Sequence, residues 1–258
     1  MTNLQASGSI AIQVPKQRKI CIATPAYKSL YTGAYVESLF QLVDEARKKG
    51  IGLAFAQVDI ADIALARNYL VSRFYFDQPA CTHLLFVDND MGFPPELIMD
   101  MLAQDAGVVG VISPKRKIDL PKLHASSETP FHKAYAKACE FIGKKASPDE
   151  RGPFIKVKQI GAGILLIKRE TITTMLEKCP DISKSNKMKD FLFGKISRYI
   201  TPFNKVQLNE VELSEDFSFC HRWTEQCGGT IMASTSSPIK HVGELTIETK
   251  FSDTWDAE

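Results

Sequence analysis

Several features that mark well-known classes of protein are missing from this sequence of 258 residues. No two of its six cysteines form a C-x-x-C pair, which argues against a zinc site. No apolar run is long enough to span a bilayer, and the first eighteen residues lack the apolar core of a signal peptide. The net charge of +2 is too small to indicate nucleic acid as a partner. These absences favour a protein of a reducing compartment, the cytoplasm, with association to a membrane surface left open.

The composition is that of an ordinary globular protein, with 44% hydrophobic and 24% charged residues. The length fits one large α/β domain with a sizeable core. We expect this domain at residues 19–243, preceded by a polar N-terminal tail at 1–18 and followed by a C-terminal tail at 244–258. No internal repeat is found.

Up to residue 112, short apolar runs alternate with segments of helical spacing. Strands are expected at 20–23, 51–58, 84–87 and 107–112, and helices at 35–49, at 61–76 and from Pro95 onward. In the first helix an apolar face is formed by Val36, Leu39, Phe40 and Val43. This alternation predicts an α/β fold with a mostly parallel central sheet that helices cover on both faces.

The pattern is weaker in the second half of the chain. Residues 113–154 are expected to form a long functional loop with a helix near 132–143, and residues 181–209 a mobile excursion. Between and after them we expect a strand-like stretch at 156–167, helices at 169–178 and 214–226, and a last strand at 231–233. Ser214 is a good N-cap for the second of these helices.

Asp88-Asn89-Asp90 directly follows an apolar strand. In an open α/β sheet ligands bind at the carboxyl ends of the strands. Carboxylates placed there are costly to bury unless something pairs with them, and Mg²⁺ or Mn²⁺ carrying nucleotide phosphates is a natural partner. The alternative is a strand-end turn capped by these side chains. From this tripeptide alone the two interpretations are about equally good.

Other polar residues and glycines also lie at or near the ends of predicted strands. Each of them has both a functional and a purely structural interpretation. The loop Thr24-Pro25-Ala26-Tyr27 follows the first strand and could contact a base or be a plain connection. Arg67 could contact phosphate, orient Asp88 or be a surface residue. Glycines in Gly161-Ala162-Gly163 allow close approach of a ligand, or mark a β-bulge. Each is ambiguous on its own.

Two further sites come late in the chain. Glu215-Asp216 lies in the first turn of a predicted helix, where acidic residues are favourable in any protein, and could also supply a general base. His241 follows the last strand and could ligate a divalent metal or be an ordinary structural histidine.

Taken in order, these elements resemble the nucleotide-sugar-dependent glycosyltransferases of the GT-A fold. The resemblance covers residues 19–243 and is strongest to the small family-2-like enzymes of bacteria and large viruses. It implies a Rossmann-like nucleotide-binding half followed by an acceptor half. It also implies transfer of a hexose or deoxyhexose from a nucleoside-diphosphate sugar, expected to be UDP-linked, to an acceptor hydroxyl of a glycan or glycoconjugate.

The resemblance also implies roles for individual residues. The donor would be bound by a set of residues comprising Thr24, Pro25, Ala26, Tyr27, Arg67, Asp88, Asn89, Lys115, Gly161, Ala162 and Gly163. Mn²⁺ or Mg²⁺ would be held by Asp88, Asp90 and His241. Asp216 would be the catalytic carboxylate, with Glu215 beside it. It would deprotonate the acceptor in an inverting mechanism, which the Glu-Asp helix favours, and would only orient the substrate in a retaining one.

Two other functions compete with this one. A sugar-1-phosphate nucleotidyltransferase shares a similar scaffold but should carry a glycine-rich phosphate loop after the first strand, and Thr24-Pro25-Ala26-Tyr27-Lys28 is poor in glycine. A non-catalytic nucleotide-sugar-binding module would need the donor residues but not Asp216.

Overall fold

The computed structural model describes residues 18–126, 128–147, 150–184 and 198–244. All but one residue of each predicted tail, and much of the predicted excursion, lie outside these ranges.

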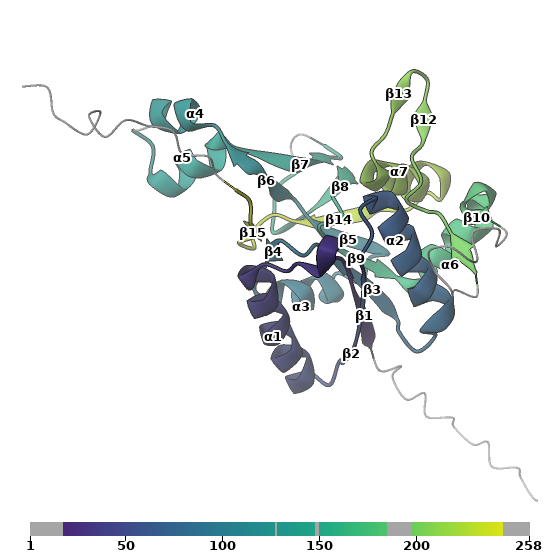
Figure 1. Ribbon diagram of the computed structural model, residues 1–258. Helices are drawn as coiled ribbons and strands as arrows, with labels where there is room; N and C mark the ends of the chain where they lie inside the picture. Colours follow the sequence, from purple (N-terminus) through teal and green to yellow (C-terminus); the bar gives the residue numbers. More distant parts are fainter. Residues whose placement is uncertain (1–17, 127, 148–149, 185–197, 245–258) are drawn as a thin grey trace, which may run out of the picture.

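A nine-stranded sheet forms the centre of the protein, with the strand order β2-β1-β3-β9-β5-β14-β8-β7-β6 (Figure 1). Its strands are β1 (Lys19–Pro25), β2 (Gly52–Val58), β3 (His83–Val87), β5 (Val108–Val111), β6 (Ser113–Ile118), β7 (Cys139–Lys145), β8 (Phe154–Ile160), β9 (Ile164–Lys168) and β14 (Ile231–Ser234). Short two-stranded pairs are formed by β4 (Met91–Gly92) with β15 (Lys240–His241), β10 (Ser183–Lys184) with β11 (Tyr199–Ile200), and β12 (Gln207–Leu208) with β13 (Val211–Glu212).

The sheet is mixed in direction. Strand β1 pairs in parallel with β2 and β3, and β5 pairs in parallel with β14. Strand β9 lies between β3 and β5 and is antiparallel to both. The predicted strand-like stretch at 156–167 is two strands, β8 and β9, separated by the glycine segment.

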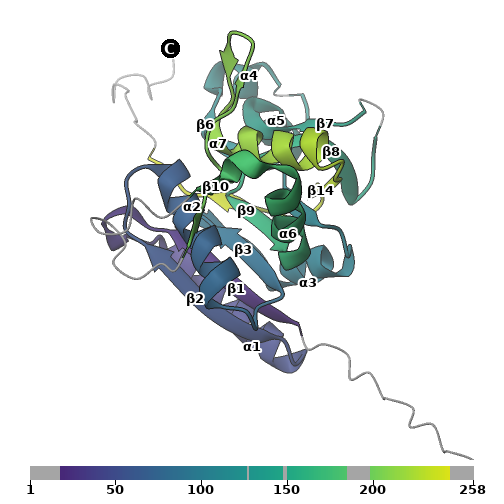
Figure 2. The same cartoon turned by 90° about the vertical axis from the view of Figure 1, so that its right-hand side faces the viewer.

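Helices cover both faces of the sheet (Figures 1 and 2). One face is covered by α1 (Gly33–Lys48) and α3 (Pro95–Ala103), the other by α2 (Ile63–Ser72), α6 (Arg169–Lys178) and α7 (Glu215–His221). Single turns η1 (Tyr27–Ser29), η2 (Arg73–Asp77), η3 (Pro180–Ile182) and η4 (Arg222–Gln226) adjoin them. The predicted α/β class, with a central sheet flanked by helices, is confirmed. No helix within the described ranges is long and apolar enough to cross a membrane.

The packing face of α1 differs from its apolar face. Its buried side chains are Tyr35, Ser38, Leu42 and Ala46, whereas Phe40 is 71% exposed and Val36 and Val43 are also exposed. Ser38 can be buried because its hydroxyl accepts a hydrogen bond from the backbone N–H of Phe93. The apolar residues that repeat along α1 therefore lie on a stripe next to the buried one and do not mark the packing face.

The predicted long loop at 113–154 is instead a structured extension, which we define as residues 113–146. It contains β6, α4 (Leu120–Ala125), α5 (Phe131–Ala138) and β7, and it projects from the body in Figure 1. The helix predicted near 132–143 ends at Ala138, because the residues after it pair with β6 and β8.

The predicted excursion at 181–209 also carries a core residue. Phe203 is fully buried and stacks on Phe219 of α7 with ring centroids 4.7 Å apart. Its backbone N–H donates to the Asn68 side chain at 2.8 Å. The part of the chain around Phe203 is thus fixed to the face of the sheet that α2 and α7 cover.

Candidate active site

The predicted site residues gather at one edge of the sheet. Strands β1 and β3 are parallel neighbours, so the loop after Pro25 and the loop beginning at Asp88 leave the same edge. Strand β9 runs the other way and starts at this edge, which places the preceding glycine segment there too. The Thr24–Tyr27 loop and the Asp88 loop therefore lie side by side.

Hydrogen bonds to three neighbouring segments fix the Asp88-Asn89-Asp90 turn. The Asp88 N–H donates to the Gly163 carbonyl at 2.8 Å, and the Val242 N–H donates to the Asp90 carbonyl at 2.9 Å. The Asn89 side chain donates to the Leu30 carbonyl at 2.7 Å. This amide therefore holds the loop after β1, and a direct contact between Asn89 and a donor stays a prediction.

Arg67 is the centre of a four-residue cluster. Its Nη2 donates to both oxygens of Asp88, at 3.3 and 3.2 Å, while its Nη1 donates to Asp216 and, at 3.4 Å, to Glu215. The Arg67 side chain is 3% exposed, so it is not a surface residue. One guanidinium thus joins the end of β3 to the first turn of α7.

Aromatic rings and the N-cap of α7 support this cluster. The Arg67 guanidinium lies 6.0 Å from the ring centroid of Phe86 and 5.9 Å from that of Phe203. Among the described residues its Nε has no hydrogen-bond partner. The Ser214 hydroxyl accepts the Phe217 N–H at 3.3 Å, which confirms the predicted N-cap and fixes the turn that carries Glu215 and Asp216.

Negative charge exceeds positive charge in the cluster, because three carboxylates share one guanidinium. Burial raises the pKa of Asp88 above its usual value; Arg67 opposes this rise, and the nearby Asp90 adds to it. The carboxylates of Asp88, Glu215 and Asp216 are still 26%, 16% and 18% exposed, so a ligand can reach them. A cation or a developing positive charge would be stabilised here.

A second group lies beside the cluster, around Asp90. Asp90 Oδ2 accepts from Arg116 Nη1 at 3.0 Å and lies 3.4 Å from His241 Nε2. His241 Nδ1 lies 2.7 Å from the Pro114 carbonyl oxygen, which can only accept, so Nδ1 carries a hydrogen. The hydrogen bond to Asp90 raises the pKa of His241, and burial opposes the rise.

The glycine segment lies between the carboxylates. A Cβ at Gly163 would stand 3.5 Å from Asp88 Oδ2, and one at Gly161 would stand 3.7 Å from Asp216 Oδ2 and 3.1 Å from Ile142 Cγ2. Ala162 between them is buried. Glycine therefore leaves space directly beside two oxygens of the cluster.

Residues of the loop after β1 divide between core and surface. Thr24 is buried, with its hydroxyl 2.5 Å from the Tyr35 hydroxyl, whereas Tyr27 is 53% exposed. Sequence reasoning missed Asp59 at the end of β2, whose carboxylate accepts the Lys28 N–H at 2.7 Å. Its position after a parallel neighbour of β1 was the available signal.

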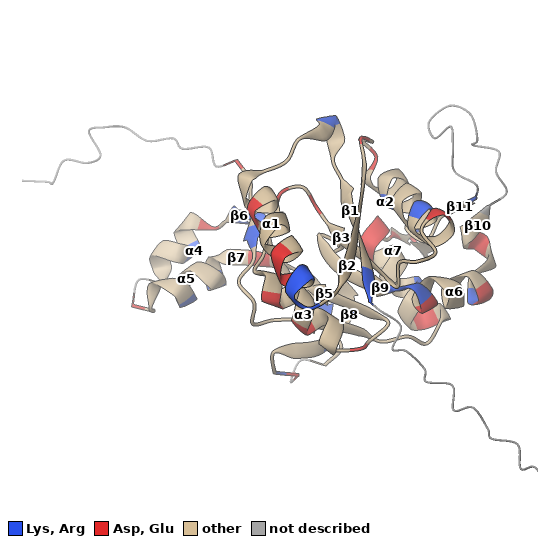
Figure 3. Ribbon diagram, turned by 90° about the horizontal axis from the view of Figure 1, so that it is seen from below, with Lys and Arg blue, Asp and Glu red and all other residues tan. Residues whose placement is uncertain are grey.

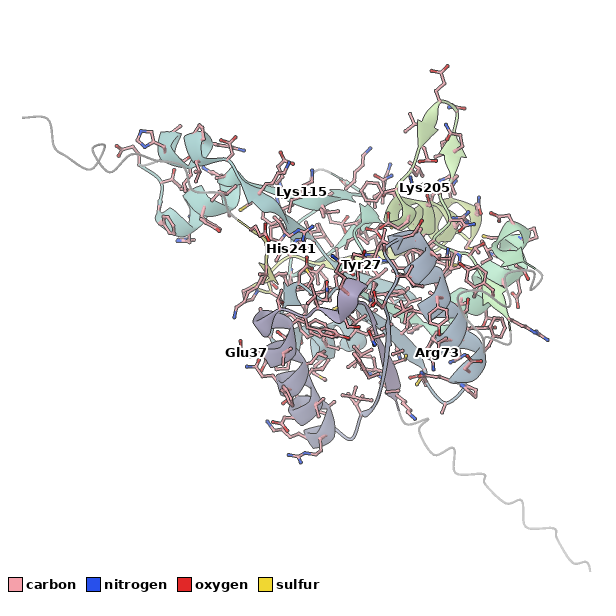
Figure 4. The ribbon with its side chains drawn as sticks, viewed as in Figure 1. Tyr27, Glu37, Arg73, Lys115, Lys205 and His241 are labelled. Atoms are coloured by element: carbon pink, nitrogen blue, oxygen red, sulfur yellow. The ribbon has the colours of Figure 1, made fainter. Side chains whose placement is uncertain are left out.

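Two neighbouring residues of the basic run on β6 have different partners. Lys115 is paired with Glu140 at 2.8 Å, whereas the next residue, Arg116, reaches Asp90. In Figure 4 the labelled Lys115, His241 and Tyr27 come from three different elements of this region. Arg116 and not Lys115 therefore meets the turn, at a place where the pairing of β6 with β7 is irregular.

No protein-family model matches this chain, and no curated protein is found to be similar to it. Several solved structures are similar. They include A197 from STIV (12% identity over 88% of this chain and 87% of that chain, TM-score 0.44). They also include Drosophila beta-1,4-galactosyltransferase 7 with manganese, UDP-Gal and xylobiose (14%, 88% and 71%, TM-score 0.43). A third is the inositol-1-phosphate CTP transferase from T. maritima (9%, 88% and 89%, TM-score 0.42). These sequence identities are too low to transfer a function, so the function must be argued from the residues of this chain.

Proposed function

We propose that this protein is a metal-dependent glycosyltransferase. It moves a sugar from a nucleoside-diphosphate sugar, UDP-linked in the first instance, to a hydroxyl of a glycan or glycoconjugate. The observation that carries the proposal is that Arg67 binds Asp88 and Asp216 at once. A carboxylate suited to the donor and a carboxylate suited to the acceptor are thereby held side by side at the sheet edge where ligands bind.

The residues around Asp90 fit a divalent cation. The Nδ1 hydrogen of His241 is held by the Pro114 carbonyl, which leaves Nε2, on the Asp90 side, as the nitrogen that would give up its proton and bind a metal. Asp90 and His241 would hold Mn²⁺ or Mg²⁺, with Asp88 as the third expected ligand. Among the described residues no group of three such side chains is already gathered as a metal site. The cation would neutralise charge on the leaving diphosphate.

On the donor side, the exposed ring of Tyr27 would contact the base, and Thr24, Pro25 and Ala26 would shape its loop. Asp59 holds this loop through the Lys28 N–H. Asp88 would face the ribose, and Arg67 keeps that carboxylate in place. Arg116, Lys115 and the Gly161–Gly163 segment would lie along the diphosphate and the sugar.

On the acceptor side, Asp216 would act as the general base. Its Oδ1 accepts from Arg67, which leaves Oδ2, on the Gly161 side, to take the proton of the acceptor hydroxyl. The acceptor oxygen forms its bond to the anomeric carbon as the bond from that carbon to the phosphate oxygen breaks. The nucleoside diphosphate leaves with the electron pair, and the configuration inverts.

Calorimetric titration tests this function. UDP- and GDP-sugars are titrated with and without Mn²⁺ into the wild type, Asp90→Ala and the exposed-site control Asp44→Ala. We expect Mn²⁺-dependent binding of a nucleotide sugar by the wild type and the control, weakened at least about tenfold in Asp90→Ala. Absence of metal-dependent nucleotide binding in the wild type would overturn the proposal. Pyrophosphate release from a nucleoside triphosphate would favour a nucleotidyltransferase instead.

A further inference from the structure

A cavity of about 620 Å³ opens beside the proposed metal site, between the extension and β15. It is lined by side chains that include Lys115, Arg116, Lys117, Tyr135, Lys240 and His241. Its volume is in the range of sites that bind small molecules. None of the donor roles above uses Lys117, Tyr135 or Lys240.

The charge of this cavity is positive. Its lining carries Lys115, Arg116, Lys117 and Lys240 against a single carboxylate, that of Glu244. Lys and Arg are visible on β6 in Figure 3. Lys115 and Arg116 are paired with Glu140 and Asp90. Within the described part of the chain, no carboxylate lies within ion-pair distance of Lys117.

Tyr135 of α5 adds an aromatic ring to the wall of the cavity. Tyr135 is 47% exposed, and Phe131, one turn earlier on α5, is 72% exposed with its ring centroid 5.8 Å away. The face of an exposed tyrosine ring suits the C–H bonds of a sugar ring. Cationic side chains and the ring of Tyr135 thus line the same cavity.

We propose that this cavity is an acceptor subsite that takes an anionic sugar, bearing a phosphate or carboxylate, stacked on Tyr135 and paired with Lys117. The proposal rests on the glycosyltransferase function above and adds the charge of its acceptor. Strand β7 supports the placement, because it pairs with β6 along the cavity while its Ile142 lies against Gly161, next to Asp216. A glycan along this ribbon would reach from the cavity to the proposed base.

Binding of simple probes tests the subsite while UDP and Mn²⁺ are present in excess. The probes are glucose 6-phosphate, methyl glucuronide and neutral methyl glucoside. At least one charged probe is expected to bind ten times more tightly than the neutral one, and its binding should weaken as salt increases. The two charged probes distinguish a phosphate from a carboxylate.

Matched variants locate the binding. Lys117→Ala and Tyr135→Ala should each weaken the charged probe about tenfold, whereas Tyr135→Phe and the exposed-lysine control Lys122→Ala should not. UDP binding should be unchanged in all four variants. The subsite is wrong if charged and neutral probes bind alike, if neither binds, or if the charged probe competes with UDP. If the charged probe binds through Lys117 but UDP and Mn²⁺ do not bind, the cavity stands and the glycosyltransferase function fails.

Discussion

Asp88 and Asp216 accept hydrogen bonds from opposite nitrogens of one buried guanidinium, that of Arg67. Asp88 directly follows β3, and Asp216 lies in the first turn of α7. Their separation is therefore set by a rigid planar fork and not by the loops between them. In the proposed mechanism this fork keeps the donor carboxylate and the general base at a fixed spacing.

Replacing Arg67 by Met should cost both stability and turnover. Three carboxylates would lose their shared cation, so the free energy of unfolding should fall by roughly 2–3 kcal/mol. This is less than for a fully buried pair, because the carboxylates are 16–26% exposed. Urea unfolding measures the change. Arg47→Met is the control. The side chains of Arg47 and its partner Asp44 are 80% and 65% exposed, so this ion pair should contribute under about 1 kcal/mol to the free energy of unfolding. Equal losses in the two variants would contradict the role of Arg67.

A side chain at Gly161 should obstruct the site without removing a charged group. A Cβ there lies 3.1 Å from Ile142 and 3.7 Å from Asp216 Oδ2, so Gly161→Val should lower turnover by more than about tenfold while UDP still binds. The rate of UDP release with saturating donor is the measurement. Gly33→Ala is the control, since a Cβ there meets nothing within 4 Å. Wild-type turnover in Gly161→Val would show that this space is not used.

Acid should destabilise the protein through His83. Burial lowers the pKa of this histidine to about 4, and its side chain belongs to the buried set at 8% exposure. In the unfolded chain the His83 side chain takes up a proton near pH 6.5, whereas in the folded protein it does so only near pH 4. The contribution of neutral His83 to the free energy of unfolding is therefore present above pH 6.5 and is lost as the pH falls toward 4. The expected loss is about 2 kcal/mol between pH 6.5 and 5.

The His83→Gln variant shows how much of the pH dependence of stability comes from His83. Its free energy of unfolding should change less between pH 7 and 5 than that of the wild type, whereas the exposed-site variant His132→Gln should follow the wild type. Identical pH dependence in the wild type and His83→Gln would rule out His83 as the source.

Much of the fold could be predicted from the sequence, because each early strand is a continuous apolar run followed by a segment with helical spacing of apolar residues. The strand order could not be predicted, because the sequence of a strand does not show which strands it pairs with. Strand β9, for example, lies between β3 and β5 and is antiparallel to both. The packing face of α1 was also hidden, because Ser38 is buried through a hydrogen bond to Phe93 and not through its own hydrophobicity.

The candidate site was predictable to the extent that its residues end strands or begin a helix. Asp88, Asp90, Asp216 and His241 were identified in this way. The partnership of Arg67 with both Asp88 and Asp216 depends on tertiary distances that a sequence does not contain. The contact of Arg116 with Asp90 was not predicted, because the pairing of β6 with β7 is irregular around Arg116 and a sequence does not show such an irregularity.

The central claim, that Asp216 serves chemistry and not donor binding, is tested most directly by one comparison of wild type and Asp216→Asn. Both proteins are titrated with UDP-sugar and Mn²⁺, and UDP release is then followed on the same preparations. We predict donor affinity within about threefold of the wild type and UDP release at least about a hundredfold slower, the range of general-base effects. UDP release at the wild-type rate would contradict the account.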